Sequence, residues 1–150
     1  MAKTLPQLMA MDGVLTLEEL LPHRPPMLLI DRVVEVNAVY ALTLSRVAQT
    51  WPMADEHGVA ALILVELAAQ TAGVCNGWER IRTRGIDSER TGWLVAVKRA
   101  EFLVSQLPFG MQLTTRAENT LEFDSFREVT SQVYDNDRLI AEVVLQLYQP

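Results

Sequence analysis

The chain has 150 residues, a formal net charge of −6 at pH 7 and a single cysteine, Cys75. This length suits one domain, residues 1–150, with a real core. The negative charge argues against a nucleic-acid partner, because binding to phosphates needs a basic surface. A lone cysteine excludes an internal disulfide, and we expect Cys75 to be a small buried hydrophobic residue.

The N-terminal residues, MAKTLPQLMAMDG, contain neither an apolar signal core nor a small-residue cleavage site. Residues 57–77 form the longest apolar run of the chain, but Glu66, Gln70 and Asn76 make that run a poor membrane span. We therefore expect a cytoplasmic protein with no membrane span.

A helix and a hairpin are predicted before the apolar run. Residues 16–19 read Thr-Leu-Glu-Glu, the pattern of a capping box, which predicts a short helix that ends before Pro22. Residues 27–37 and 39–47 are rich in strand-forming residues. They predict two strands joined as a hairpin around the Asn-Ala pair at 37–38.

The apolar run predicts a long helix over residues 59–81, with Gly85 as its stop. A helix that is apolar on all sides is usually wrapped by the rest of its protein. Strands with alternating polar and apolar residues are predicted after it, over 92–104, 111–122, 126–136 and 138–148. This order of elements predicts an α+β fold, in which an antiparallel sheet curls round one buried helix.

Glu66 is the one acid inside the predicted helix core. Burying a carboxylate in an apolar helix is unfavourable unless the group is paired or protonated. Glu66 is therefore either a functional acid or a structural acid that pairs with an arginine of a strand or of a partner chain. We favour the functional interpretation, because the cost of burial needs a reason.

Three stretches resemble one family, and together they cover most of the chain. Residues 20–33, LLPHRPPMLLIDRV, are similar to the opening of the 3-hydroxyacyl-[acyl carrier protein] dehydratases. Residues 59–73, VAALILVELAAQTAG, are similar to their helix, and residues 98–113 resemble one of their strands with its turn. The resemblance implies a hot-dog fold, usually a homodimer whose two sheets join edge to edge.

The resemblance also implies a function and a site. It implies dehydration of 3-hydroxyacyl thioesters in fatty acid or polyketide-type lipid metabolism. The acyl group would be attached to an acyl carrier protein or to CoA. Glu66 matches the family's helix carboxylate, and Gln70, one turn later, would orient it. The active site would lie at the dimer interface, covered by residues 51–57 of the partner chain.

The family's second catalytic group is a loop histidine, and this chain departs from the pattern there. Alignments of the loop place Pro52 or Trp51 at that position. His57, nine residues before Glu66, is the nearest histidine and our catalytic candidate, with a surface or helix-cap role as the alternative. Trp51 is expected to fill the space of the missing imidazole or to pack in the core.

Further roles follow from the predicted elements. The N–H groups of Gly58 and Val59, at the predicted helix start, are candidates to bind the thioester carbonyl oxygen. His23 and Arg24 are expected to hold the first strand through hydrogen bonds. Six basic residues form either a docking face for an acidic carrier protein or an ordinary solvated helix end: Arg80, Arg82, Arg84, Arg90, Lys98 and Arg99.

Two alternatives to a dehydratase remain open. One is a hot-dog thioesterase, in which Glu66 activates water or attacks the thioester itself. The other is a non-catalytic, dehydratase-like subunit that binds thioesters without turnover. The two histidines and one cysteine form no metal-ligand motif, and no phosphate-binding loop is present, so we expect no metal and no cofactor.

Overall fold

The computed structural model describes residues 15–150, in which six antiparallel strands form one sheet with the order β1-β2-β6-β7-β8-β4. The prediction that no secretory signal is present concerns residues outside this range. A second sheet pairs β3 with β5. The strands are β1 Arg32–Val36, β2 Tyr40–Arg46, β3 Val59–Ala60, β4 Trp93–Phe102, β5 Gln106–Leu107, β6 Gln112–Phe123, β7 Phe126–Asp135 and β8 Arg138–Tyr148.

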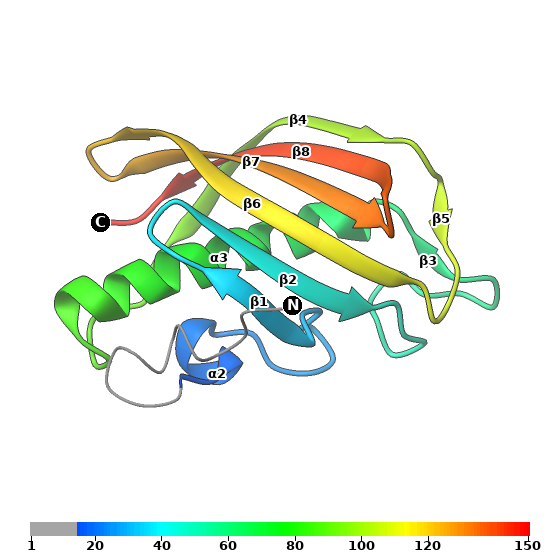
Figure 1. Ribbon diagram of the computed structural model, residues 1–150, viewed down its shortest axis with the longest axis horizontal. Coiled ribbons are helices and arrows are strands. Elements are labelled where there is room, and N and C mark those ends of the chain that lie inside the picture. Colours follow the sequence, from blue (N-terminus) through cyan, green and yellow to red (C-terminus); the bar gives the residue numbers. More distant parts are fainter. Residues whose placement is uncertain (1–14) are drawn as a thin grey trace.

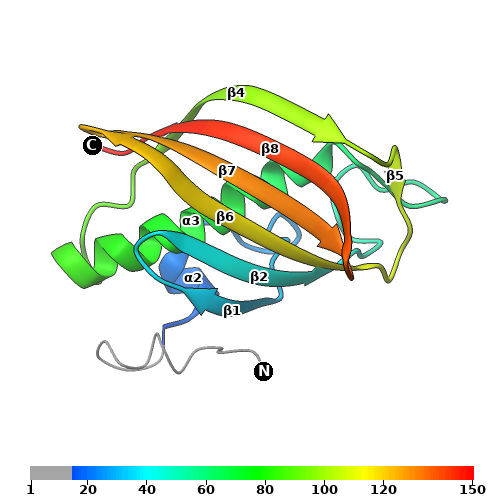
Figure 2. The same ribbon diagram turned by 45° about the horizontal axis from the view of Figure 1, so that its top comes forward.

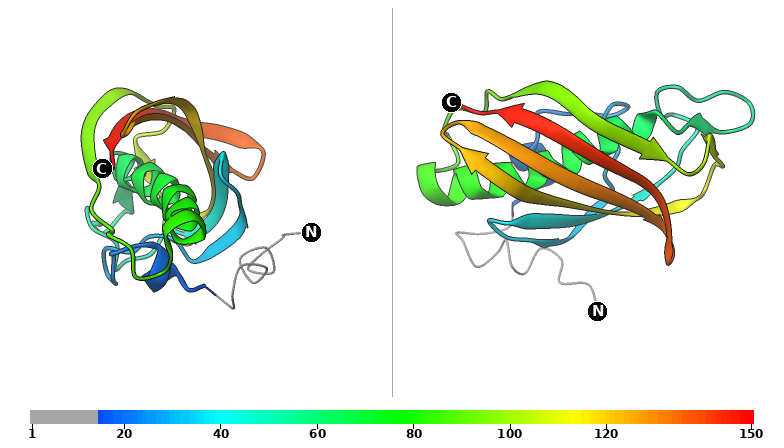
Figure 3. Two further views of the ribbon diagram at one scale, coloured as in Figure 1. Left: turned by 90° about the vertical axis from the view of Figure 1, so that its left-hand side faces the viewer. Right: turned by 90° about the horizontal axis from the view of Figure 1, so that it is seen from above.

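The large sheet curls round one long helix, α3, Ile63–Arg84 (Figure 1). Seen along that helix, the strands form an arc over it, and the short helix α2, Leu17–Leu20, lies on the side that the arc leaves open (Figure 3). Buried apolar residues of α3 and the sheet make the core. Among the described residues, no helix is long and apolar enough to cross a membrane. The predicted α+β architecture of the hot-dog fold is confirmed.

The local sequence signals form as predicted. Thr16 and Glu19 make the capping box, with Thr16 Oγ1 accepting from the Glu19 N–H at 3.2 Å. Asn37 Oδ1 accepts from two N–H groups of the turn between β1 and β2. Gly85 ends α3 with φ at 92°, and its N–H donates to the carbonyl of Ile81.

Two elements start four or five residues later than predicted. The helix begins at Ile63 rather than at residue 59, because β3 takes up residues 59 and 60 and pairs with β5 (Figure 1). The first strand begins at Arg32 rather than at residue 27, because backbone groups of Met27 and Leu29 bind the side chain of Gln70 instead of a neighbouring strand.

Cys75 is buried, as predicted. Its Sγ donates to the carbonyl of Asn37 at 3.2 Å, which ties α3 to the β1–β2 turn. Burial raises the pKa of the Cys75 thiol to about 12. The thiol therefore stays protonated at neutral pH and serves as a packing group rather than as a nucleophile.

Candidate active site

The segment that leads from α2 to β1 packs against one face of α3. Glu66, Gln70, Gly73 and Gly77 are spaced by four, three and four residues, so they form one row along the helix. Residues 20–29 pack along this row, and α2 lies beside α3 (Figure 2). The row thereby determines where the α2–β1 segment lies in relation to Glu66.

The two glycines of the row let the α2–β1 segment approach the helix closely. A Cβ on Gly77 would lie 2.5 Å from the carbonyl oxygen of Leu20, and a Cβ on Gly73 would lie 2.7 Å from Leu21 Cδ2. The Leu21 side chain can rotate away, but the Leu20 carbonyl belongs to the backbone. Gly77 is therefore the position at which a side chain would displace the segment.

The substitution Gly77→Ala is expected to lower the free energy of unfolding by about 1–3 kcal/mol, the usual cost of overpacking. Helix propensity alone would act the other way and stabilise the variant by about 1 kcal/mol. Thermal unfolding measures the balance. Gly92→Ala is the matched control, since its Cβ would lie 3.6 Å from the nearest atom. A Gly77→Ala protein that melts higher than the parent would contradict the close approach.

The close approach of the α2–β1 segment brings His23 to Glu66. The distance between His23 Nε2 and Glu66 Oε1 is 3.1 Å, and the two side chains are 30% and 33% exposed. Glu66 is thus half-buried at the edge of the helix, and its partner is a histidine rather than an arginine. The backbone hydrogen bonds that we expect of the His23 side chain are not found in the described part of the chain. The glycine row below Glu66 is the sequence signal that could have indicated this contact.

Gln70 contacts the same carboxylate oxygen of Glu66 that faces His23. Its Nε2 donates to Glu66 Oε1 at 2.9 Å and to the carbonyl of Met27 at 2.7 Å. Its Oε1 accepts from the N–H of Leu29 at 2.9 Å, and the side chain is fully buried. Two backbone groups therefore fix the amide, and the predicted contact between Gln70 and Glu66 is present.

Arg24 fixes the turn that carries His23. Its Nη1 donates to the carbonyls of Leu21 at 3.0 Å and His23 at 2.8 Å. Its Nη2 donates to the carbonyl of Glu18. Arg24 therefore acts through hydrogen bonds to backbone, as expected, although on the turn rather than on the first strand.

His57 lies in the loop before β3 and is not brought to Glu66 within this chain. Its side chain is 72% exposed, and its Nε2 lies 3.3 Å from Oε1 of the neighbouring Glu56. Its N–H donates to Asp55 Oδ1 at 2.7 Å. Of the two histidines, His23 is the one that the structure places beside the helix carboxylate.

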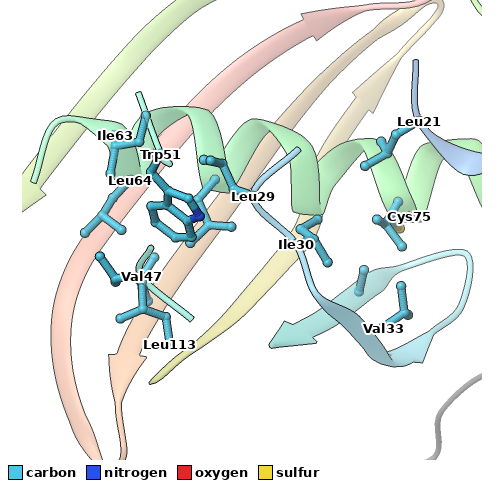
Figure 4. Packing of buried hydrophobic residues seen from close by; sticks show 14 of the residues in the cluster. Leu21, Leu29, Ile30, Val33, Val47, Trp51, Ile63, Leu64, Cys75 and Leu113 are labelled. Carbon is cyan, nitrogen blue, oxygen red and sulfur yellow. The ribbon is translucent and has the colours of Figure 1, made fainter. Parts of the chain in front are cut away.

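Trp51 packs in the core. It is 6% exposed and lies among Val47, Leu29 and Leu64 (Figure 4). It is not one of the residues that line the cavity beside Glu66. Of the two roles that the sequence leaves open, the structure therefore supports packing.

Gly58 and Val59 do not begin the helix, and that prediction is wrong. The N–H of Gly58 already donates to Asp55 Oδ1 at 3.1 Å. Val59 is fully buried in β3, where it pairs with Leu107. Because the helix starts at Ile63, the helix-start argument for a carbonyl-binding role applies to neither residue.

A cavity of about 270 Å³ opens beside the His23–Glu66 pair. Its floor is the row of α3, continued by Asn76 and Arg80, and its walls come from the turn before His23 and from the start of β4 and the end of β8. The volume is at the small end of the range for ligand pockets. The pair thus stands at one end of an elongated hollow along the helix.

The basic residues that could form a docking face are divided by the fold. Three are ion-paired on the surface: Arg82 with Glu79, Lys98 with Glu128, and Arg99 with Glu101 and Glu142. Arg80, by contrast, is only 4% exposed and lines the cavity. The six do not form one continuous surface patch.

Comparison with known proteins identifies relatives of this arrangement. The family model described as ApeP-like, ApeP dehydratase, matches residues 15–150. The 3-hydroxyacyl-[acyl-carrier-protein] dehydratase FabZ of Streptococcus uberis is 38% identical over 69 residues, which are 43% of this chain and 49% of that protein. The chain thus matches about half the length of this curated relative.

Two examples represent the solved structures that share the fold. One is the dehydratase heterocomplex ApeI:P from Xenorhabdus doucetiae, with a TM-score of 0.80 and 23% identity over 91% of both chains. The other is a hypothetical thioesterase with coenzyme A from Streptococcus pneumoniae, with a TM-score of 0.59 and 8% identity over 77% of this chain and 82% of that one.

Proposed function

This chain belongs to the ApeP-like dehydratase family, and from that premise we propose that it removes water from 3-hydroxyacyl thioesters, with His23 and Glu66 as its acid–base pair. The observation that carries the proposal is the 3.1 Å contact between His23 Nε2 and Glu66 Oε1 on the wall of a cavity. The contact sets a histidine beside Glu66, whereas the loop has Trp51 and Pro52 at the positions that align with the family's histidine.

The reaction needs a base for the C2 proton and an acid for the C3 hydroxyl. Histidine is a common general base, so His23 takes the C2 proton, and Glu66, as the acid of the pair, gives a proton to the departing hydroxyl. The C2–H electron pair forms the new double bond, the C3–O bond breaks and water leaves. Imidazolium and carboxylate remain, and the proton crosses from Nε2 to Oε1 to restore the pair.

Gln70 is a positioning residue in this scheme. Its amide is fixed by backbone groups of Met27 and Leu29 and donates to the same Oε1 that faces His23. The carboxyl is therefore held in one rotamer before substrate arrives, which is the kind of preorganisation that acid–base catalysis needs. The name of the FabZ relative suggests an acyl carrier protein as the carrier of the thioester, and the thioesterase neighbour solved with coenzyme A suggests CoA as the alternative.

The test is an assay of 3-hydroxyacyl and trans-2-enoyl thioesters, followed by absorbance of the conjugated enoyl thioester and, in parallel, by release of free thiol. Enoyl formation with no thiol release supports the dehydratase. Thiol release without enoyl formation would instead support hydrolysis by Glu66, the reaction class named for one structural neighbour. Binding with neither product would support a non-catalytic subunit.

We also propose that β4 pairs with the edge of a second hot-dog chain, in the simplest case another copy of this one. β4 closes one end of the large sheet, and within residues 15–150 it pairs only with β8 (Figure 2). Successive residues of β4, on both of its faces, are large, apolar and about half exposed: Trp93, Leu94, Val95 and Val97. Such an edge is a template for pairing with another strand.

Val97→Lys is expected to shift the protein from dimer to monomer, because a charged side chain on an edge strand opposes pairing. Sedimentation velocity measures the change. Val39→Lys is the control, since Val39 is equally exposed but lies in the β1–β2 turn. A parent protein that is already a monomer would contradict self-pairing and favour a second, related chain, as in the neighbour named a heterocomplex.

A further inference from the structure

The helix α2, which comes just before the turn of His23, has a carbonyl that the helix itself cannot satisfy. In a continuing helix the carbonyl of Glu18 would accept from the N–H four residues later, but that residue is Pro22, which has no N–H. With four residues, α2 is also too short to be stable alone. The position of α2, and of the turn that follows it, therefore depends on groups outside the helix.

Two arginines donate to the carbonyl of Glu18. Arg24 Nη2 does so at 3.4 Å and Arg90 Nη1 at 3.0 Å, and a carbonyl oxygen has two lone pairs with which to accept both. Arg24 belongs to the turn of His23 itself. Arg90 lies in the segment between α3 and β4, which passes beside α2 (Figure 3). Arg90 is thus the anchor that reaches α2 from another part of the chain.

The segment that carries Arg90 is itself fixed to α3. Arg80, which is only 4% exposed, donates from Nη1 to the carbonyl and the hydroxyl of Ser88 at 3.1 and 2.6 Å. On the other side of Arg90, the N–H of Thr91 donates to Glu89 Oε1 at 3.1 Å. Hydrogen bonds therefore hold the backbone both before and after Arg90, and its side chain starts from a fixed point.

We propose that Arg90 is a positioning residue for His23 and acts through the carbonyl of Glu18. Arg90 holds the end of α2, and the turn that follows α2 presents His23 to Glu66. Arg24 extends the hold, because its Nη1 donates to the carbonyl of His23 at 2.8 Å while its Nη2 donates to the same oxygen of Glu18 as Arg90 does. The α3–β4 segment thereby helps to place the base of the acid–base pair.

Two other roles for Arg90 compete with this one. Arg90 also lines the cavity, so it could contact substrate directly, and its removal would then change KM. Arg90 and Arg24 are like charges at one oxygen, so removal of Arg90 could instead relieve repulsion and leave Arg24 more firmly bound. The three roles predict different kinetics, and the test is designed to separate them.

Arg90→Met keeps an unbranched side chain in an exposed place and removes its donors. It is expected to lower kcat about 10-fold with KM within about twofold, because a small misplacement of a catalytic group is costly even when the substituted residue lies away from the chemistry. Arg90→Lys restores one donor, which is enough for one carbonyl, and should bring kcat to within about threefold of the parent. The measurement is enoyl formation from a short 3-hydroxyacyl thioester of N-acetylcysteamine, which involves no carrier protein.

Two further variants make the comparison specific. Arg84→Met is the matched control, because Arg84 is also exposed and donates from Nη1 to a backbone oxygen, that of Pro150 at 3.1 Å, but does not line the cavity. It should keep the parental kcat. Ser88→Ala loosens the segment before Arg90 without altering the cavity lining, and it should lower kcat by about 2- to 5-fold, the effect of one hydrogen bond.

A second readout does not depend on turnover. The chain has two histidines, so NMR resonances of the imidazole rings can be assigned from a single His57→Ala variant. Arg90→Met and Ser88→Ala are expected to shift the ring resonances of His23 and to leave those of His57, which contacts Glu56 on the loop before β3. Arg90→Lys should return the His23 resonances close to their parental values.

The inference rests on the proposed function, and the two readouts separate them. Shifted His23 resonances in a protein that dehydrates nothing would sustain the positioning role and reject the proposed reaction. In a protein that does dehydrate, a kcat that Arg90→Met leaves unchanged or raises would overturn the inference and leave the reaction in place. A loss confined to KM, or a lower kcat with unshifted His23 resonances, would overturn it as well.

Discussion

Glu66→Gln is expected to lower kcat for dehydration by about 10²- to 10⁴-fold, the usual contribution of a general acid. Glutamine has nearly the same shape as glutamate, and its carbonyl can still accept from Gln70 Nε2. The fold and the cavity should therefore persist while the group that protonates the hydroxyl is lost. Steady-state formation of the enoyl thioester measures the effect.

Glu56→Gln is the matched control for this variant. Glu56 is also a carboxylate next to a histidine, but its side chain is 85% exposed and lies on the loop before β3. The Glu56→Gln variant should retain full activity. Its midpoint of thermal unfolding should equal that of Glu66→Gln, so that a difference in activity does not reflect a difference in stability. Turnover by Glu66→Gln within twofold of the parent would remove Glu66 from the reaction and with it the proposed mechanism.

His23→Ala is expected to lower kcat by a similar factor, because its ring is the proposed base and lies 3.1 Å from Glu66. The side chain is 30% exposed, so its removal leaves no closed hole in the core. The double variant with Glu66→Gln should be about as slow as either single variant, since residues that act as a unit have strongly non-additive effects.

His57→Ala decides between the two histidines. Its exposed side chain contacts Glu56 within this chain, so the variant should keep parental activity. If His57→Ala lost activity and His23→Ala kept it, the base would be the loop histidine of a second chain reaching across a dimer interface. That outcome would support His57, the catalytic candidate named from the sequence.

The elements of the fold could be read from the sequence because their signals are local. The capping box at residues 16–19, the turn at Asn37 and the stop at Gly85 each lie within a few residues of the atoms that they bind. The alternation of apolar and polar residues in the later strands likewise indicates which residues face the core and which face solvent. The predicted boundaries of those strands agree with β4, β6, β7 and β8 to within about two residues.

The start of α3 could not be read in the same way. An apolar run gives the same signal in a buried strand as in a buried helix. Val59–Ala60 become β3 because residues 106 and 107, far along the chain, supply a strand to pair with. The assignment of Gly58 and Val59 as helix-start donors failed for this reason.

Half of the candidate site was visible in the sequence and half was not. Glu66 and Gln70 stand one helical turn apart, so helix geometry alone places them in contact. His23 lies 43 residues before Glu66. Its position depends on how closely the segment before β1 packs on α3, and that distance is set by the missing side chains of Gly73 and Gly77.

The sequence by itself therefore determined the central helix, the strands around it and the carboxylate with its amide partner, because periodicity, caps and one-turn spacings are properties of neighbouring residues. Only the tertiary structure decided which histidine meets Glu66, that Trp51 belongs to the core, and that Arg80 closes the far end of the cavity. Each of these depends on packing between segments far apart in the chain, and such contacts leave no local pattern to read.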